Sequence, residues 1–228
     1  MESALLFSRL VKIGERQLKT ADTAAELLCD ALRAAALPYR VQEFSLSIPR
    51  HRNAELIVDN MSVPCVATSF ASGDIPGKEI ILSSAMPMAE SPDLPNINVN
   101  PYCPAISRAN HYRRPAVAVS HGSLATVLRG KKVHGRIEVD IVDGQARNIL
   151  VGNAESPRTI VFSHFDSVGP GACDNVSGTI AMLETLRRKP SLQDDALWIF
   201  SGAEELSTES PHYWGAGYRH RSFCLDRS

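Results

Sequence analysis

The stretch Thr159-Ile-Val-Phe-Ser-His-Phe-Asp-Ser-Val-Gly-Pro-Gly-Ala-Cys-Asp-Asn-Val-Ser-Gly178 decides the fold of this chain. It begins with a short apolar run that ends in His164-Phe-Asp166. A glycine-rich turn then leads to Asp174-Asn175, where an amphipathic pattern starts. This order is typical of a buried strand, a tight turn and a helix. The polar side chains stand where the strand ends, which is the edge at which open α/β sheets bind ligands.

A second apolar run, Leu197-Trp-Ile-Phe200, follows about one βα unit later and is closed by the carboxylate pair Glu204-Glu205. The segment 176–188 between the two runs has apolar residues at helical spacing, and Pro190 ends it. Continuous apolar strands separated by a helix predict a parallel sheet that is buried on both faces. We therefore predict an α/β fold, with a mostly parallel sheet flanked by helices.

Two further parts of the chain differ in the secondary structure that their sequences predict. Residues 4–37 are predicted to be helical, and residues 39–48 alternate like a half-exposed strand. Residues 49–143 contain many prolines and short β-prone runs, which predicts a small β-rich insert; within it, Asn96-Ile-Asn-Val-Asn100 is predicted to be an irregular loop. The predicted division is 1–48 for helices and a strand of the core, 49–143 for the insert, and 144–228 for the rest of the core.

Composition excludes several classes of protein. The chain has 228 residues, of which 44% are hydrophobic and 21% charged, and its formal net charge is −1. That balance gives no electrostatic reason to expect binding to nucleic acid or to an anionic membrane. No apolar run approaches the roughly 20 residues that span a bilayer. We expect neither nucleic acid nor membrane as a partner.

The cysteines, the N-terminus and the predicted sheet edge bear on the cellular compartment and the oligomeric state of the protein. The five cysteines are odd in number and show no CxxC spacing, so a disulfide framework is not expected. The N-terminus lacks the pattern of a secretory signal. We therefore expect a cytoplasmic protein. A homo-oligomer stays open, because an uncovered sheet edge could pair with a second copy.

The residues at the two strand ends have the chemistry of a hydrolytic metal site. Hydrolysis of an amide needs an activated water and charge stabilisation, which two metal ions can supply. His164 offers a nitrogen ligand, and Asp166 can accept the other ring N–H. Asp174, predicted to cap a helix, could bridge two cations. Glu205 is a candidate ligand, and Glu204 is the candidate base. Each residue alone has an ordinary structural explanation, but their joint order favours a catalytic site.

Three motifs carry a family resemblance: His164-Phe-Asp-Ser-Val168, Gly171-Ala-Cys-Asp-Asn-Val-Ser-Gly178 and Phe200-Ser-Gly-Ala-Glu-Glu-Leu206. They resemble the di-zinc exopeptidases of the aminopeptidase Y and leucyl aminopeptidase type, whose relatives include glutaminyl cyclases and glutamate carboxypeptidases. The resemblance implies a phosphorylase/hydrolase-like zinc exopeptidase core. It also implies that residues 49–143 are a shortened insert of the protease-associated kind.

The resemblance implies a set of zinc ligands. His164 would bind one zinc, Asp174 would bridge both ions, and Glu205 would bind the other. The sequence Cys224-Leu-Asp226 resembles the family's next motif. This resemblance implies that Asp226 is a further ligand of the zinc bound by His164. The family's last ligand is a His further downstream, and this sequence stops at Ser228. We therefore expect a C-terminally short core.

The resemblance implies a zinc metallo-aminopeptidase that removes N-terminal residues from peptide substrates. Glu204 and Asp166 would be its catalytic residues, the first as base and the second as the group that orients His164. Two zinc ions are expected from the family, and one remains an alternative here. Two other functions stay open: a catalytically impaired or single-zinc relative that binds peptides or partners, and a zinc enzyme that acts like a glutaminyl cyclase.

Overall fold

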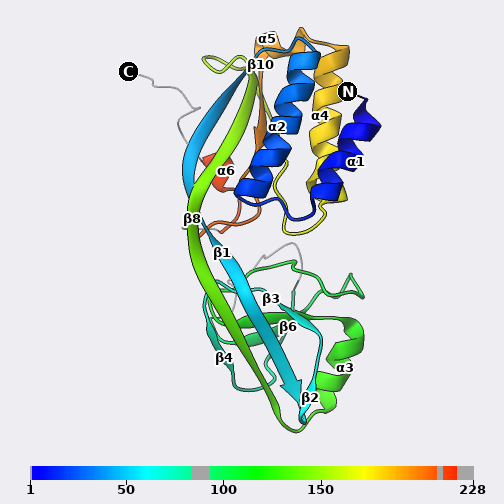
Figure 1. The fold of residues 1–228 in the computed structure, drawn as a ribbon, viewed down its shortest axis with the longest axis vertical. Helices are drawn as coiled ribbons and strands as arrows, with labels where there is room; N and C mark the ends of the chain where they lie inside the picture. The colour runs from blue at the N-terminus through cyan, green and yellow to red at the C-terminus, as the bar shows by residue number, and fades with distance from the viewer. Residues whose placement is uncertain (1, 84–92, 210–212, 220–228) are drawn as a thin grey trace. The chain divides into compact units, whose positions relative to one another are not determined.

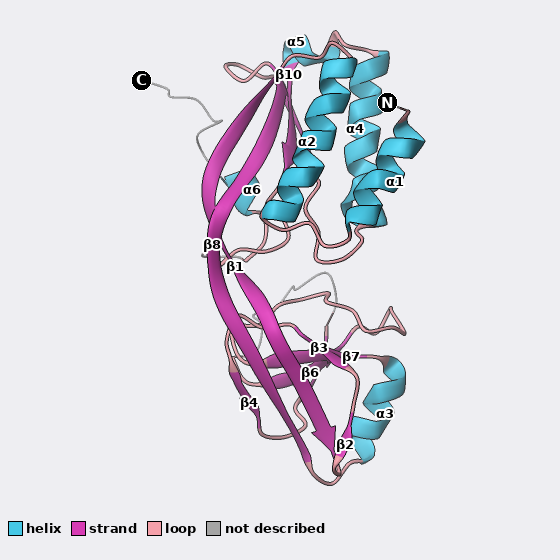
Figure 2. Cartoon of the chain, in the orientation of Figure 1, coloured by secondary structure: helices cyan, strands magenta, loops and turns pink. Residues whose placement is uncertain are grey.

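The computed structural model describes residues 2–83, 93–209 and 213–219. The chain forms two compact units, one made of Met1–Ser47 with Asp143–Ser228 and the other of Ile48–Val142. Figure 2 shows that the first unit combines helices with strands, whereas the second consists mainly of strands. Two long strands, β1 (Tyr39–Val58) and β8 (Val133–Gly152), each run from one unit into the other.

The first unit contains a sheet whose strand order is β1-β8-β10-β9. β10 pairs in parallel with β9 and antiparallel with β8. The predicted α/β class, a sheet flanked by helices, is confirmed. The sheet is mixed rather than mostly parallel, because β8 returns from the inserted segment and runs against β10. Besides β1 and β8, the elements of this unit are α1 (Ser3–Ile13), α2 (Lys19–Ala34), β9 (Thr159–His164), the π-helical turn η1 (Ala172–Ser177), α4 (Gly178–Arg188), α5 (Leu192–Asp195), β10 (Ala196–Ser201) and α6 (Ala216–Arg219).

The core of the first unit lies between one face of the sheet and the helices α1, α2 and α4 (Figure 1). Leu10 and Leu32 from the helices pack with Ile149 and Phe200 from the strands, and all four side chains are at most 1% exposed. All six residues of β10 are buried. β10 is therefore a central strand whose end is held by its neighbours. No helix in the described ranges is long and apolar enough to cross a membrane.

The second unit is rich in strands. A four-stranded sheet has the order β3-β7-β6-β5, and β4 pairs with β8. Its core gathers Val117 and Val119 from β7, Ile97 from β6, and Leu56 and Ile137 from the two long strands. The likeness of this unit to a protease-associated insert stays a prediction. Its elements are β2 (Met61–Ser62), β3 (Cys65–Ala67), β4 (Gly73–Ile75), β5 (Ile80–Leu82), β6 (Asn96–Val99), β7 (Ala116–Val119) and α3 (His121–Arg129).

The prediction of an irregular loop at residues 96–100 is wrong. Asn96–Val99 forms β6, which is buried at all four positions and pairs in parallel with both β5 and β7. The amide of Asn98 donates to Thr68 Oγ1 at 2.9 Å and to the carbonyl of Val117 at 3.0 Å. These bonds satisfy the amide N–H groups of Asn98, whereas its buried Oδ1 has no partner among the described residues.

The helical core yields a stability prediction. Leu186 lies near the end of α4 and is fully buried. We expect Leu186→Ala to lower the free energy of unfolding by about 2–5 kcal/mol, because it leaves a cavity among the helices. Chemical denaturation of the metal-free protein measures this. The matched control is Leu5→Ala on α1, where the side chain is 55% exposed and the change should stay within about 0.5 kcal/mol.

Candidate metal centre

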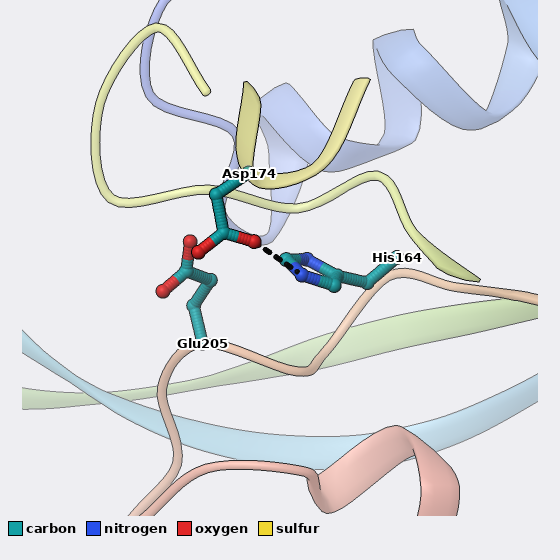
Figure 3. Close-up of side chains that lie close together, drawn as sticks. All are labelled: His164, Asp174 and Glu205. Atoms are coloured by element: carbon teal, nitrogen blue, oxygen red, sulfur yellow. Dashed lines mark hydrogen bonds and ion pairs between the residues drawn. The ribbon is translucent and has the colours of Figure 1, made fainter. Parts of the chain in front are cut away.

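Three segments of the first unit bring candidate metal ligands together. β9 ends at His164, which lies opposite Ser201 at the end of β10. Because the two strands are parallel, the loops that follow them leave the sheet at the same edge. Figure 3 shows His164, Asp174 and Glu205 converging there. One ligand atom from each residue lies within 4.8 Å of the other two.

The imidazole of His164 is buried and has a carboxylate on each side. Its Nε2 lies 3.0 Å from Oδ1 of Asp174, and its Nδ1 lies 3.4 Å from Oδ1 of Asp166. Nε2 also lies 3.8 Å from Oε2 of Glu204. The ring therefore presents Nε2 to the ligand cluster and Nδ1 to Asp166. Nδ1 also lies 3.2 Å from the main-chain carbonyl of Asp166, so the carbonyl and the carboxylate of this residue together favour a proton on Nδ1 and leave Nε2 for the cluster.

Asp166 does more than face His164. Its carboxylate is fully buried and accepts hydrogen bonds from the main-chain N–H groups of Glu204, at 3.0 Å, and Glu205, at 2.9 Å. Hydrogen bonds to an ionised acceptor are the strong ones. Asp166 thus ties the end of β9 to the loop that follows β10. No motif in the sequence indicates this second role, because the donors are main-chain groups.

The loop that carries Glu204 and Glu205 is also held from its other side. The carbonyl of Glu204 accepts from the N–H of Gly215 at 2.5 Å, and the carbonyl of Ala203 accepts from that of Gly217 at 2.7 Å. A Cβ on Gly217 would stand 2.0 Å from Oγ of Ser201, so only glycine allows α6 to approach the end of β10 this closely. The two glutamates are consequently fixed on both sides.

The prediction that Asp174 caps the following helix is wrong. Asp174 and Asn175 have non-helical backbone angles within η1, and the peptide bond between them is cis. Asn175 provides the cap instead, since its Oδ1 accepts from the N–H of Gly178 at 3.1 Å, where α4 begins. The carboxylate of Asp174 is therefore free of the helix and turns toward His164. Its side chain is 79% exposed, so it is the part of the cluster open to solvent.

Burial and neighbouring charges raise the pKa values of several groups in the cluster, so these groups retain their protons to higher pH. Burial lowers the pKa of His164, but its hydrogen bonds with Asp166 and Asp174 outweigh burial and raise that pKa to about 11. The hydrogen bond with His164 lowers the pKa of Asp174. Burial and the charge of Asp166 raise the pKa of Glu205 to about 8, and burial raises that of Glu204. A cation at this site would have to displace protons, as is usual for metal binding.

The structure brings most of the predicted site residues together. His164, Asp174 and Glu205 form the cluster, with Asp166 and Glu204 against it. Asp226 lies outside the described residues. The roles assigned to these side chains stay predictions.

Sequence reasoning missed two residues near the site. The ring of Tyr218 packs against Phe162 of β9 at 4.8 Å, and burial raises the pKa of its phenol. Arg16, between α1 and α2, is fully buried and bonds to the loop between His164 and Asp174. No motif in the sequence marks either residue.

Residues 148–222 match the family model described as peptidase family M28. The match covers all three motifs of the site, so the resemblance read from the sequence is confirmed. None of the curated proteins is similar enough in sequence to count as a match.

Two solved structures share the fold of this chain. BSAP, a zinc aminopeptidase from Bacillus subtilis, superposes with a TM-score of 0.59 at 19% identity, over 88% of this chain and 60% of that one. A peptidase M28 precursor from Shewanella amazonensis gives a TM-score of 0.54 at 15% identity, over 87% and 63%. The chain therefore spans about 60% of the length of the aminopeptidase that it resembles. At such identities the likeness shows the fold.

Asp166 yields a prediction that separates its two roles. In Asp166→Asn, the new amide can accept through one oxygen only, and the N–H groups of Glu204 and Glu205 lose part of their acceptor. We expect the free energy of unfolding to fall by about 1–3 kcal/mol. Zinc affinity should fall roughly 10–100-fold, since His164 loses the carboxylate beside Nδ1. Denaturation and zinc titration measure the two effects. Unchanged values in both would show that Asp166 neither holds the loop nor orients His164.

The pKa shifts predict how stability depends on pH. His164 and Glu205 both have pKa values raised by folding, so the stability that they contribute is present at low pH and is lost as pH rises through their folded pKa values, about 11 and about 8. The pKa of Asp174 is lowered from the ordinary aspartate value of 3.8, so its contribution to stability changes only in acid, below that pH. Metal-free protein should therefore become less stable from about pH 6 to about pH 9, by at most about 1.4 kcal/mol per pH unit and group. Thermal melts in a chelator measure this, with Glu205→Gln as the variant that should flatten the slope.

Proposed function

We propose that this chain is a zinc-dependent peptidase that removes N-terminal residues from peptides. One observation carries the proposal. His164, Asp174 and Glu205 place one ligand atom each within 4.8 Å of one another, at the end of two parallel strands, inside the segment that matches family M28. Each of these residues has an ordinary structural role elsewhere in proteins, but their convergence in one acidic cluster has no structural purpose that we can identify.

The donor set fits zinc. It combines one imidazole nitrogen with carboxylate oxygens, which are ligands that zinc accepts. His164 would bind through Nε2, since Nδ1 faces Asp166. Asp174 and Glu205 would bind through carboxylate oxygens. When bound, zinc would polarise the scissile carbonyl and make a water acidic enough to lose its proton near neutral pH.

Glu204 has the position expected of the general base. Its Oε2 lies beside the cluster, 3.8 Å from Nε2 of His164, while its main chain is held by Asp166. Burial raises the pKa of Glu204, and a carboxylate with a raised pKa is a better proton acceptor at neutral pH. Glu204 would take a proton from the attacking water and deliver it to the leaving amide nitrogen. Its neighbour Glu205 would meanwhile serve as a ligand.

The substrate class rests on analogy with the solved relatives. BSAP is described as a zinc aminopeptidase, and the chain shares its fold. An aminopeptidase has to bind the free amine of its substrate, and the cluster is rich in carboxylates that could attract a cation. These two points support N-terminal cleavage.

One zinc per chain is the alternative to two. Among the described residues, a single group of ligand atoms of this kind comes together, which is enough for one ion. A single-zinc relative could bind peptides with little or no hydrolysis. The number of zinc ions per chain therefore decides between the two functions.

The test uses two matched variants of adjacent residues. We expect Glu204→Gln to abolish hydrolysis of leucine p-nitroanilide, by at least about 100-fold, because it removes a base. Its zinc content should equal that of the wild type. Glu205→Gln should instead lower zinc content, because it removes a ligand. Zinc is counted by elemental analysis after dialysis against a fixed free concentration.

His164→Ala is the control for specific zinc binding and should lose both zinc and activity. The reverse pattern, with zinc lost in Glu204→Gln and kept in Glu205→Gln, would exchange the two roles. Wild-type protein that binds no zinc would refute the proposed function. Zinc binding without turnover would favour the peptide-binding alternative, and cyclisation of an N-terminal glutaminyl peptide without hydrolysis would favour a cyclase.

A further inference from the structure

Arg16 is a charged side chain with no exposure at all, and it heads the group of largest fully buried side chains. It lies in the first unit, in the short connection between α1 and α2. Burying a guanidinium is unfavourable unless its donors are satisfied. The hydrogen bonds of its guanidinium therefore show which segments of the fold Arg16 holds together.

Every acceptor of Arg16 within the described residues is a main-chain carbonyl. Nε donates to Phe165 at 2.5 Å, and Nη1 donates to Pro170 at 2.8 Å. Nη1 also reaches Gly14 at 3.0 Å and Leu10 at 3.1 Å, near the end of α1. The guanidinium thus links α1 to the loop that leaves β9.

The main chain of Arg16 also forms hydrogen bonds with the same loop. Its N–H donates to the carbonyl of Ser167 at 3.0 Å, and its carbonyl accepts from the N–H of Ser167 at 3.1 Å. Nη2 lies 3.5 Å from the carbonyl of Gly171. Gly171 has a φ of +57°, and a Cβ there would stand 2.5 Å from Nη2 and 2.6 Å from the carbonyl oxygen of Asp174. Glycine at this position lets the loop close over the guanidinium.

The residues that Arg16 holds alternate with those of the site. Phe165 lies between His164 and Asp166, Ser167 follows Asp166, and Gly171 comes three residues before Asp174. The loop between the first two candidate ligands is thus fixed at its beginning and at its end. The guanidinium is planar and has several N–H donors in fixed directions, so it can orient several loop carbonyls at once.

Charge supports the same reading. Burial lowers the pKa of Arg16, whereas the negative charges of Asp166 and Glu205 raise it. The guanidinium remains a cation next to an acidic cluster. It can reduce the repulsion among the carboxylates without occupying the place of a ligand.

We propose that Arg16 is the positioning residue of the metal centre: its buried guanidinium fixes the loop 165–171, so that His164 and Asp174 keep their mutual geometry before a metal binds. The inference rests on the proposed function, since it needs a metal at the cluster. It assigns a role in zinc affinity to a residue that contacts no ligand side chain directly.

The experiment compares Arg16→Met, Arg16→Lys and Leu186→Ala with the wild type. Met removes the charge and every donor but keeps an unbranched side chain, Lys keeps the charge without the planar fork, and Leu186→Ala lowers stability at the far end of α4. Zinc affinity is measured by competition with a chelator. The absorption spectrum of the cobalt-substituted proteins reports ligand geometry, which a loss of stability alone does not change.

We expect Arg16→Met to weaken zinc binding roughly 10–100-fold, as changes behind the ligands do, and to alter the cobalt spectrum. Arg16→Lys should recover little of the affinity. Leu186→Ala should keep the affinity within about twofold and the wild-type spectrum, since no ligand is touched. Should Arg16→Met fail to fold, Arg16→Lys carries the comparison.

Two results would overturn the proposal. Wild-type affinity and spectrum in a folded Arg16 variant would show that Arg16 only supports the core. Full recovery in Arg16→Lys would show that its charge matters and its geometry does not. Failure of the proposed function looks different, because the wild type itself would then bind no zinc, or would bind it equally well after His164→Ala.

Discussion

The hydrogen bonds from the main-chain N–H groups of Glu204 and Glu205 to the carboxylate of Asp166 connect the two halves of the site. Parallel pairing of β9 with β10 places the strand ends side by side, but it leaves the following loops without fixed positions. Asp166 supplies the missing constraint, since it also faces Nδ1 of His164. Three site residues are thereby tied to one buried carboxylate. Because the donors are main-chain groups, the side chains of the two glutamates stay available for chemistry.

The same arrangement brings several carboxylates close together, and protons and the charge of Arg16 offset the repulsion among them. Four carboxylates surround His164 within a small volume: Asp166, Asp174, Glu204 and Glu205. Without metal, the proton on His164 and the raised pKa of Glu205 reduce the negative charge. The guanidinium of Arg16, which donates to carbonyls of the loop, contributes a positive charge. A divalent ion would replace the protons, so metal binding and proton release are coupled.

The sequence was sufficient to single out the candidate ligands that the structure brings together, because their signal is local. His164, Asp174 and the glutamate pair each follow a recognisable strand or turn pattern, and their order matches family M28. The α/β class followed from the apolar runs at 159–162 and 197–200. Other features escaped because tertiary pairing outweighed local patterns. β1 continues through Pro49. The surrounding prolines suggested a loop at 96–100, yet Asn96–Val99 forms a buried strand in which the amide of Asn98 donates to Thr68 and Val117.

The hydrogen bonds that hold the candidate ligands in place could not be predicted from the sequence, for a physical reason. The acceptors of Arg16 and the donors to Asp166 are main-chain groups, which every residue possesses and no motif can mark. Asp174 illustrates the same limit. Its place before an amphipathic helix indicated a cap, yet the backbone of η1 gives that role to Asn175 and turns the carboxylate of Asp174 toward His164. A carboxylate that does not cap the helix is able to turn toward the cluster, so the departure from helical geometry at η1 is what makes Asp174 available to the candidate site.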